Sequence, residues 1–257
     1  MMKKKNQATV GLIAAIILLA CACPVSGLPS LGVEATPYPT IPPIAPSTEA
    51  VVPSPTTEIS PSENIPSGNV LYSDDFSTTS AELEDYSGDG GSAGTENGVY
   101  VIRSTADLWQ WGKSQSEFED VVIDVDATMI SGPSNNNIGF GVFCRLTETE
   151  DGSVDGYMLA ISGDGYYTIR VIVESNMSPL VDWTSSDVVN QGNVTNHIHA
   201  TCNGSDLSLE VNGQVVATAV ADPSAPTVGA IAFSAISFET DSRYAEVNFD
   251  NLVVSQP

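Results

Sequence analysis

The stretch "NHIHATCNGSDLSLEVNGQVVATAV", residues 196–220, predicts three short strands joined by two tight turns. Apolar residues alternate with polar ones over 198–202 and again over 207–211. A period of two is typical of strands that bury one face. The pairs Asn203-Gly204 and Asn212-Gly213 stand between these runs, and Asn-Gly tolerates the positive φ that two-residue hairpin turns require. The stretch therefore predicts an antiparallel meander.

Short runs of the same kind recur along most of the remaining chain, whereas no segment of ten or more residues keeps a helical period. "SAELED" (80–85) could form one helical turn, and the glycine-rich "SGDGGSAG" (87–94) is expected to form a loop. The regular spacing predicts an all-β fold, a two-sheet antiparallel sandwich or jelly roll. The other expected strands are 70–76, 98–104, 120–130, 138–146, 156–162, 166–173, 180–185, 229–236 and 245–254.

The amino terminus has the features of an export signal. Three lysines precede the apolar run "VGLIAAIILLA", which is too short for a comfortable membrane span, and Cys21 follows a small residue. Leu18-Leu19-Ala20-Cys21 resembles the bacterial lipobox, in which the cysteine is acylated. We therefore expect a signal peptide at 1–20 and an extracytoplasmic lipoprotein, anchored by Cys21 to the membrane at the bacterial cell surface or envelope. Ordinary signal cleavage and an uncleaved anchor are the alternatives.

Residues 21–67 are expected to be a disordered linker rather than a domain. The segment from Pro24 to Ser67 contains eleven of the sixteen prolines, no lysine or arginine, and one aromatic residue, Tyr38. Extended polyproline conformations at about 3.1 Å per residue would give a stalk on the order of 100 Å long. The remaining residues, 68–257, are long enough to bury a core as one domain.

The net charge limits the partners of the chain. Without the three amino-terminal lysines, five basic residues stand against 32 acidic ones, a net charge of about −27. Such a surface repels nucleic acid and anionic lipid, so we expect no nucleic-acid partner and contact with the membrane only through the lipid anchor.

The domain as a whole resembles laminin-G-like and concanavalin A-like jelly rolls. The resemblance spans nearly all of residues 70–255 and depends on "LYSDDFS", "ISGDGYYTIR", "LVDWTSS", "LSLEVNGQVV" and the closing "VNFDNLVV". Within that group the chain resembles the domain family named for 3-keto-disaccharide hydrolases. The resemblance implies a two-sheet sandwich, and a sugar-related role as a family tendency.

Acidic residues share the polar face of the expected strand "DVVIDVDATM", with Asp120, Asp124 and Asp126 on the same side. Glycosidases of concanavalin A-like folds often carry three acids on one strand, and their chemistry needs two carboxyls at a defined separation. Here Thr128 and Met129 occupy the positions of the last acid. Asp124 and Asp126 are therefore weak catalytic candidates, and a solvated polar face is the better interpretation.

Both histidines, His197 and His199, lie on one face of one strand, and the spacing indicates no third zinc ligand. No Gly-x-Ser-x-Gly elbow accompanies them, so a nucleophile triad is not expected. We interpret them as exposed strand residues.

Aromatic side chains are the candidate ligand-binding residues. Trp109 and Trp111 stand two positions apart and should project together, while Trp183 and Tyr166 lie in or beside other strands. Flat aromatic faces stack on sugar rings, although tryptophan more commonly fills a core.

Two further sites follow from the residue pattern. Cys144 and Cys202 occupy core-facing positions and are the only pair in the domain, so export predicts a disulfide between them. The sequence also predicts one cofactor, a structural Ca²⁺ at the place where the two ends of the domain meet. Its ligands would be Asp250 and either Asp74 or Asp75. Charged edge residues beside turns are the alternative.

Together these patterns predict an envelope lipoprotein that displays a non-catalytic module for binding a glycan or another envelope ligand. An enzyme acting on glycosides or keto-sugars, and a purely structural display domain, are the alternatives.

Overall fold

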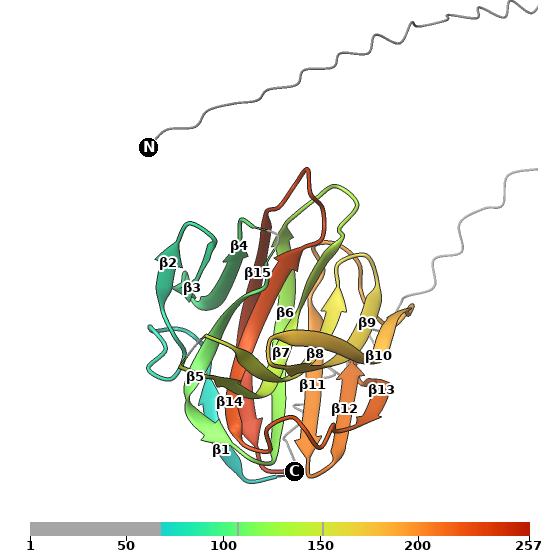
Figure 1. The fold of residues 1–257 in the computed structure, drawn as a ribbon. Helices are drawn as coiled ribbons and strands as arrows, with labels where there is room; N and C mark the ends of the chain where they lie inside the picture. Colours follow the sequence, from blue (N-terminus) through green and yellow to red (C-terminus); the bar gives the residue numbers. More distant parts are fainter. Residues whose placement is uncertain (1–67, 107, 151) are drawn as a thin grey trace, which may run out of the picture. The chain divides into compact units, whose positions relative to one another are not determined.

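The computed structural model describes residues 68–106, 108–150 and 152–257, which form two antiparallel sheets and, within these ranges, no helix (Figure 1). The predicted all-β, two-sheet sandwich is confirmed. Accordingly, the described residues contain no helix that is long and apolar enough to cross a membrane. The signal peptide, Cys21 and the linker lie outside the described residues.

One sheet has six strands in the order β10-β9-β8-β7-β14-β5. Every neighbouring pair in it is antiparallel. Its strands are β5 (Gln110–Phe118), β7 (Ile138–Glu148), β8 (Val154–Ser162), β9 (Tyr166–Val173), β10 (Asn176–Ser185) and β14 (Gly229–Ser237).

The other sheet has nine strands in the order β13-β12-β11-β6-β15-β4-β3-β2, and β1 also pairs with β15. The first and last strands of the domain therefore lie side by side, as the sequence predicted. Its strands are β1 (Val70–Asp74), β2 (Tyr86–Gly88), β3 (Gly91–Glu96), β4 (Val99–Ser104), β6 (Val121–Ser131), β11 (Asn196–Asn203), β12 (Asp206–Val211), β13 (Gln214–Val220) and β15 (Ala245–Ser255).

The meander that predicted the fold is β11-β12-β13, with one turn as expected and one displaced. Asn212 and Gly213 form the two-residue loop between β12 and β13, with φ of 51° and 80°. Between β11 and β12, however, Asn203 pairs with Asp206, so the loop consists of Gly204 and the residue after it. Glycine adopts the φ of 54° at Gly204 without the Cβ clash that most other residues would meet there.

Two local predictions were wrong. The glycine-rich segment 87–94 forms most of the β2-β3 hairpin instead of a loop. The segment 80–85 is not helical, because Leu83 makes a bridge to Ser114 and packs into the core with 3% of its surface exposed. Burial of Leu83 thus aligns the segment with the edge of the six-stranded sheet.

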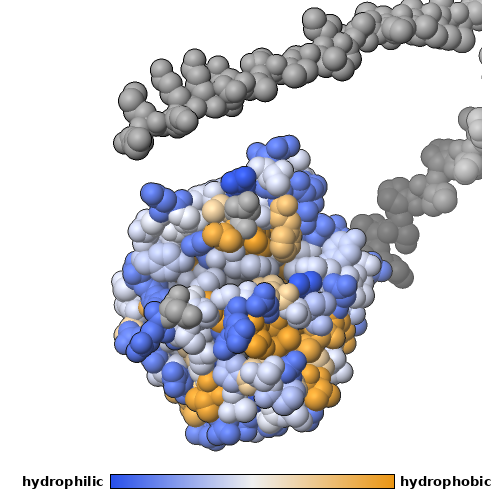
Figure 2. All heavy atoms as spheres, viewed as in Figure 1, coloured by the Kyte–Doolittle hydropathy of each residue, from blue (hydrophilic) through white to orange (hydrophobic). Residues whose placement is uncertain are grey.

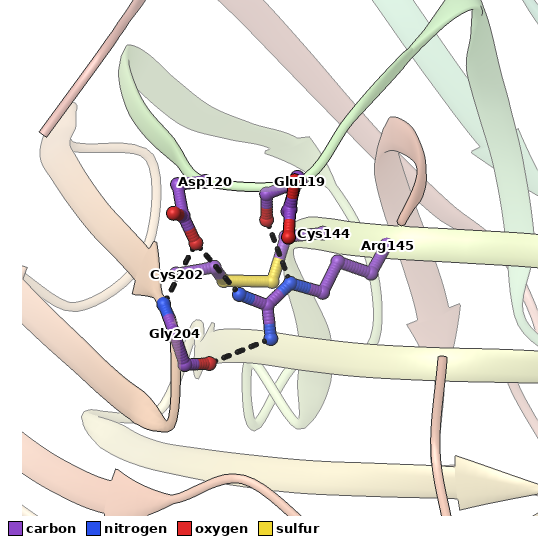
Figure 3. Close-up of a disulfide and its surroundings, with 6 residues drawn as sticks. All are labelled: Glu119, Asp120, Cys144, Arg145, Cys202 and Gly204. Carbon is purple, nitrogen blue, oxygen red and sulfur yellow. Dashed lines mark hydrogen bonds and ion pairs between the residues drawn. A yellow bond between two sulfur atoms is a disulfide. The ribbon is translucent and has the colours of Figure 1, made fainter. Parts of the chain in front are cut away.

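The core lies between the sheets, and a disulfide crosses it. Cys144 of β7 bonds to Cys202 of β11, with 6.7 Å between their Cα atoms, which confirms the predicted pair (Figure 3). Both residues are fully buried. Because β7 and β11 belong to different sheets, the bond ties the two layers together.

Arg145, beside this disulfide, is a buried charge that the sequence did not indicate. It is 2% exposed and has a φ of 54°, at an irregularity in the pairing of β7 with β8. Its guanidinium donates to the carbonyls of Glu119 (2.8 Å) and Gly204 (3.0 Å) and to Asp120 (3.2 Å) (Figure 3). The backbone N–H of Gly204 also donates to Asp120, at 2.7 Å. Arg145, from the six-stranded sheet, thus joins the β5-β6 turn, which connects the two sheets, to the β11-β12 turn of the nine-stranded sheet.

Candidate functional site

The outer face of the six-stranded sheet is apolar, although antiparallel sheets commonly expose a polar outer face to water. A second cluster of buried residues lies there, separate from the core between the sheets. The partly buried side chains Trp109, Trp111, Trp183 and Met177 pack on this cluster. Figure 2 shows hydrophobic residues in patches on the face in view, bordered by hydrophilic ones. The cluster consists of Phe143, Leu146, Val154, Met158, Ala160, Ile172, Ala230 and Ala232.

A groove of about 570 Å³ opens on this face. Its volume falls within the range of small-ligand sites. Its apolar lining comes from β5, β7, β8, β9, β10 and the segment before β5. Its polar lining is Glu84, Tyr86, Gln110, Glu148 and Ser175. The main apolar lining residues are Leu108, Trp109, Trp111, Phe143, Ile172 and Met177.

The paired tryptophans project to the same side, as the sequence predicted, and both line the groove. The ring of Trp111 meets Phe143 edge-on at 6.3 Å, and Trp109 meets Phe238 at 6.0 Å. Gly139 permits this packing, because a Cβ there would lie 2.7 Å from the ring of Trp109 and 2.8 Å from that of Phe238. Neither tryptophan is fully buried, so part of each ring remains available to a ligand.

Trp183 extends the same aromatic row, although it does not line the groove. Its ring meets Phe238 at 5.8 Å, and the guanidinium of Arg170 lies 6.0 Å from its centroid. Tyr166, 38% exposed, lies at the start of β9 with the same parity as Ile172 and is also outside the groove. The structure therefore brings the three tryptophans to one face and leaves Tyr166 at its edge.

Charged side chains that the sequence analysis did not single out form the polar side of the groove. Lys113 pairs with Glu148 and lies 3.9 Å from Glu84. The indole N–H of Trp111 donates to Glu148 at 3.3 Å, so Glu148 connects the ring to the ammonium. The hydroxyl of Tyr86 lies 3.1 Å from the carbonyl oxygen of Trp111. These contacts fix the orientation of Trp111.

The acidic strand lies on the other sheet, away from the groove. Asp124 and Asp126 of β6 are on the outer face of the nine-stranded sheet, directly opposite His199 and His197 of β11. Nδ1 of His199 is 2.7 Å from Asp124, and Nδ1 of His197 is 2.9 Å from Asp126. Asn251 donates to Asp126 at 2.9 Å. The solvated face expected here is thus a paired His–Asp network.

This pairing sets the protonation of the network. Burial alone would raise the pKa of Asp124, but hydrogen bonds from His197 and His199 outweigh it and lower the pKa to about 2. The same hydrogen bonds, first to Asp124 and then to Asp126, raise the pKa of His197 to about 9. At neutral pH Asp124 is therefore an anion beside a charged histidine, which does not suit it to donate a proton.

The described residues contain no group of three or more His, Cys, Asp or Glu side chains that could hold a metal ion. Asp74 and Asp75 line a hollow between β1 and β15. Asp74 accepts the N–H of Phe76 at 2.8 Å, and Asp250 accepts that of Asn251 at 2.7 Å. The calcium site stays a prediction.

The groove was not predicted, although the sequence contains a signal for it. The runs "IGFGVFCRL", "GYMLAIS" and "GAIAFSAI" are almost continuously apolar rather than alternating. Such runs are typical of strands covered on both faces. In the structure every residue of "GAIAFSAI" is buried. Continuous apolar strands in an otherwise alternating sandwich thus indicate that aromatic side chains cover the outer face.

No protein-family model and no curated protein matches the chain. Solved structures do match. A Bacillus subtilis protein of unknown function with a galectin-like fold is 11% identical, with a TM-score of 0.55 over 74% of this chain and 96% of its own. A Bacillus licheniformis β-glucanase is 13% identical, with a TM-score of 0.52 over 74% and 100%. LamAcat from Zobellia galactanivorans is 11% identical, with a TM-score of 0.50 over 73% and 98%. These similarities show a galectin-like, concanavalin A-like jelly-roll fold.

Proposed function

We propose that the domain binds polysaccharide in the groove of the six-stranded sheet without cleaving it. The observation that carries the proposal is the pair Trp109 and Trp111, whose half-buried rings border the groove. Sugar rings present C–H groups that stack on aromatic faces, while their hydroxyls need polar partners, here Glu84, Gln110 and Glu148. A β-glucanase among the solved structures of similar fold supports this ligand class.

We further propose that the protein acts at the bacterial envelope. Acylation at Cys21 would anchor it to the membrane, and the proline-rich segment 21–67 would hold the domain at a distance from the bilayer. A stalked binding domain of this kind would retain polysaccharide at the cell surface.

Binding should be weak and should depend on the rings. Each stacked ring contributes on the order of 1 kcal/mol, which gives dissociation constants between about millimolar and micromolar. Affinity electrophoresis of the purified full chain in gels containing a mixed-linkage β-glucan, a galactomannan, a dextran, alginate or polygalacturonate would measure them. Trp111→Ala should weaken binding about fivefold, and Trp111→Phe should restore part of the loss. Val215→Ala, at a 61% exposed position of the other sheet, is the matched control.

Trp183 should matter only for long ligands, because it lies in the aromatic row but outside the groove. Trp183→Ala should therefore weaken binding of polymers and leave that of tetrasaccharides unchanged. If no polysaccharide in the panel is retarded, or if Trp111→Ala binds like the wild type, the proposed site is wrong.

A glycoside or 3-keto-disaccharide hydrolase is the second candidate, and one observation favours it. Glu84 and Glu148 both line the groove, and each has an oxygen within 3.9 Å of Lys113 Nζ. Two carboxyls at one site are the minimum for glycoside hydrolysis. Both carboxylates, however, are paired with the ammonium of Lys113. Release of reducing sugar, abolished in Glu148→Gln, would establish the hydrolase.

A further inference from the structure

Among the described residues no cation lines the groove, and the lysine that contacts its two acids, Lys113, is already paired with them. Lys113 contacts Glu148 directly and has Glu84 at 3.9 Å, so the three side chains together carry one net negative charge. The nearest arginine on this sheet face, Arg170, does not line the groove, lies over the ring of Trp183, and pairs with Asp182 at 3.4 Å. A ligand carboxylate in the groove would therefore meet two protein carboxylates and an ammonium that is already occupied.

The same groups suit an uncharged sugar. Carboxylates accept hydrogen bonds from hydroxyls, and charge-assisted bonds of this kind are stronger than neutral ones. Recognition of a carboxylate, by contrast, typically uses an arginine fork or an unpaired lysine. The net charge of the chain, −24, also repels an anionic polymer.

We propose that Glu84, Lys113 and Glu148 make the groove selective for uncharged polysaccharides and exclude polyuronates. This inference rests on the proposed function, since it names the ligand class of the same groove. Glu148 acts twice, because it neutralises Lys113 and also orients the indole of Trp111.

The test uses two ligands that differ only in charge. The neutral polymer of the panel that binds most tightly is compared with the same polymer after oxidation of its C6 hydroxymethyl groups to carboxylates, using the full chain at low ionic strength. The wild type should bind the oxidised polymer roughly fourfold more weakly, the effect of one net unit charge about 5 Å from a ligand carboxylate in a high-dielectric site. Salt should reduce this difference.

A charge variant then inverts the preference. Glu84→Gln/Glu148→Gln keeps an acceptor for Trp111 but changes the local charge from −1 to +1, so the ratio of oxidised to neutral binding should rise at least tenfold. The matched control is Glu96→Gln/Glu246→Gln. It removes the same two charges from around Arg103, in the nine-stranded sheet, and should leave the ratio unchanged.

The outcomes separate the inference from the function on which it rests. If the wild type binds alginate, polygalacturonate or the oxidised polymer as tightly as the neutral one, the selectivity is refuted and the groove remains a glycan site. If both double variants raise the ratio equally, overall charge is responsible and the assigned residues are wrong. If the wild type binds no polymer at all, the proposed function fails and the inference fails with it.

Discussion

The disulfide between the sheets should supply a large share of the stability of the domain. Cys144 and Cys202 are 58 residues apart in the sequence and fully buried. In the chain-entropy treatment, a cross-link that closes a loop of this length lowers the entropy of the unfolded chain by about 14 cal/mol/K, or about 4 kcal/mol at 25 °C. Cys144→Ala/Cys202→Ala should therefore lower the free energy of unfolding by about 4 kcal/mol. Since a domain is typically stable by only 5–15 kcal/mol, the loss would be large.

Equilibrium unfolding of the full chain in guanidinium chloride, followed by tryptophan fluorescence, would measure this loss. Reductant should shift the midpoint of the wild type toward that of the double variant and leave the variant itself unchanged. Alkylation of the unfolded, unreduced wild type should modify neither residue. A loss below about 1 kcal/mol, or two alkylatable thiols in the unreduced wild type, would refute the reasoning.

Four further predictions concern other parts of the chain. Because the pKa of Asp124 falls from 3.8 to about 2 on folding, its stabilisation should disappear as pH drops from about 4 to 2. Because that of His197 rises from 6.5 to about 9, its stabilisation should disappear as pH increases from about 6.5 to 9. Partial exposure of the network limits each change to at most about 2 kcal/mol. Unfolding curves of Asp124→Asn should lose the part of the acid limb due to Asp124 and show a smaller alkaline limb, because His197 still pairs with Asp126. Arg145→Met should cost about 3 kcal/mol in the same measurement, since it removes the cation paired with Asp120 and the donor to two turn carbonyls, and an unchanged midpoint would contradict this. Cys21→Ala should release the protein from the membrane fraction and remove the acyl mass, whereas unchanged fractionation would exclude the anchor. Calcium should raise the melting temperature and chelator should lower it if the β1-β15 acidic residues bind the ion, and indifference to both would exclude the site.

Local patterns predicted most of the strands, though not β5 or the β2-β3 hairpin, because burial of one face imposes a period of two. The same parity placed Trp109 beside Trp111 and turned Cys144 and Cys202 toward the core. These predictions needed only the alternation along each strand, together with the expectation that the domain is exported and its two cysteines are oxidised. Such predictions succeed because alternation and burial depend on the sequence of a single strand.

Contacts between distant strands were beyond such reasoning. His197 and Asp126 are 71 residues apart and meet because β11 pairs with β6 in one register, which the sequence does not specify. Lys113 meets Glu148 only because β14 places β5 and β7 in one sheet. The buried position of Arg145 depends on an irregularity in the pairing of β7, which no local pattern indicates. Strand order and irregularities, rather than composition, thus determine the candidate site.

The two outer faces differ in chemistry, and this difference is the main reason to favour binding over hydrolysis. The acids first considered for catalysis, Asp124 and Asp126, are paired with histidines on the nine-stranded sheet, where they stabilise adjacent strands. The groove lies on the six-stranded sheet, and its polar groups are arranged around Lys113 and serve to hold Trp111. A hydrolase needs its acids and its sugar platform at one site, whereas a binding module needs only the platform. The groove's own acids, Glu84 and Glu148, are paired with Lys113, and the acids of β6 lie on the other sheet, which is why we propose binding without cleavage.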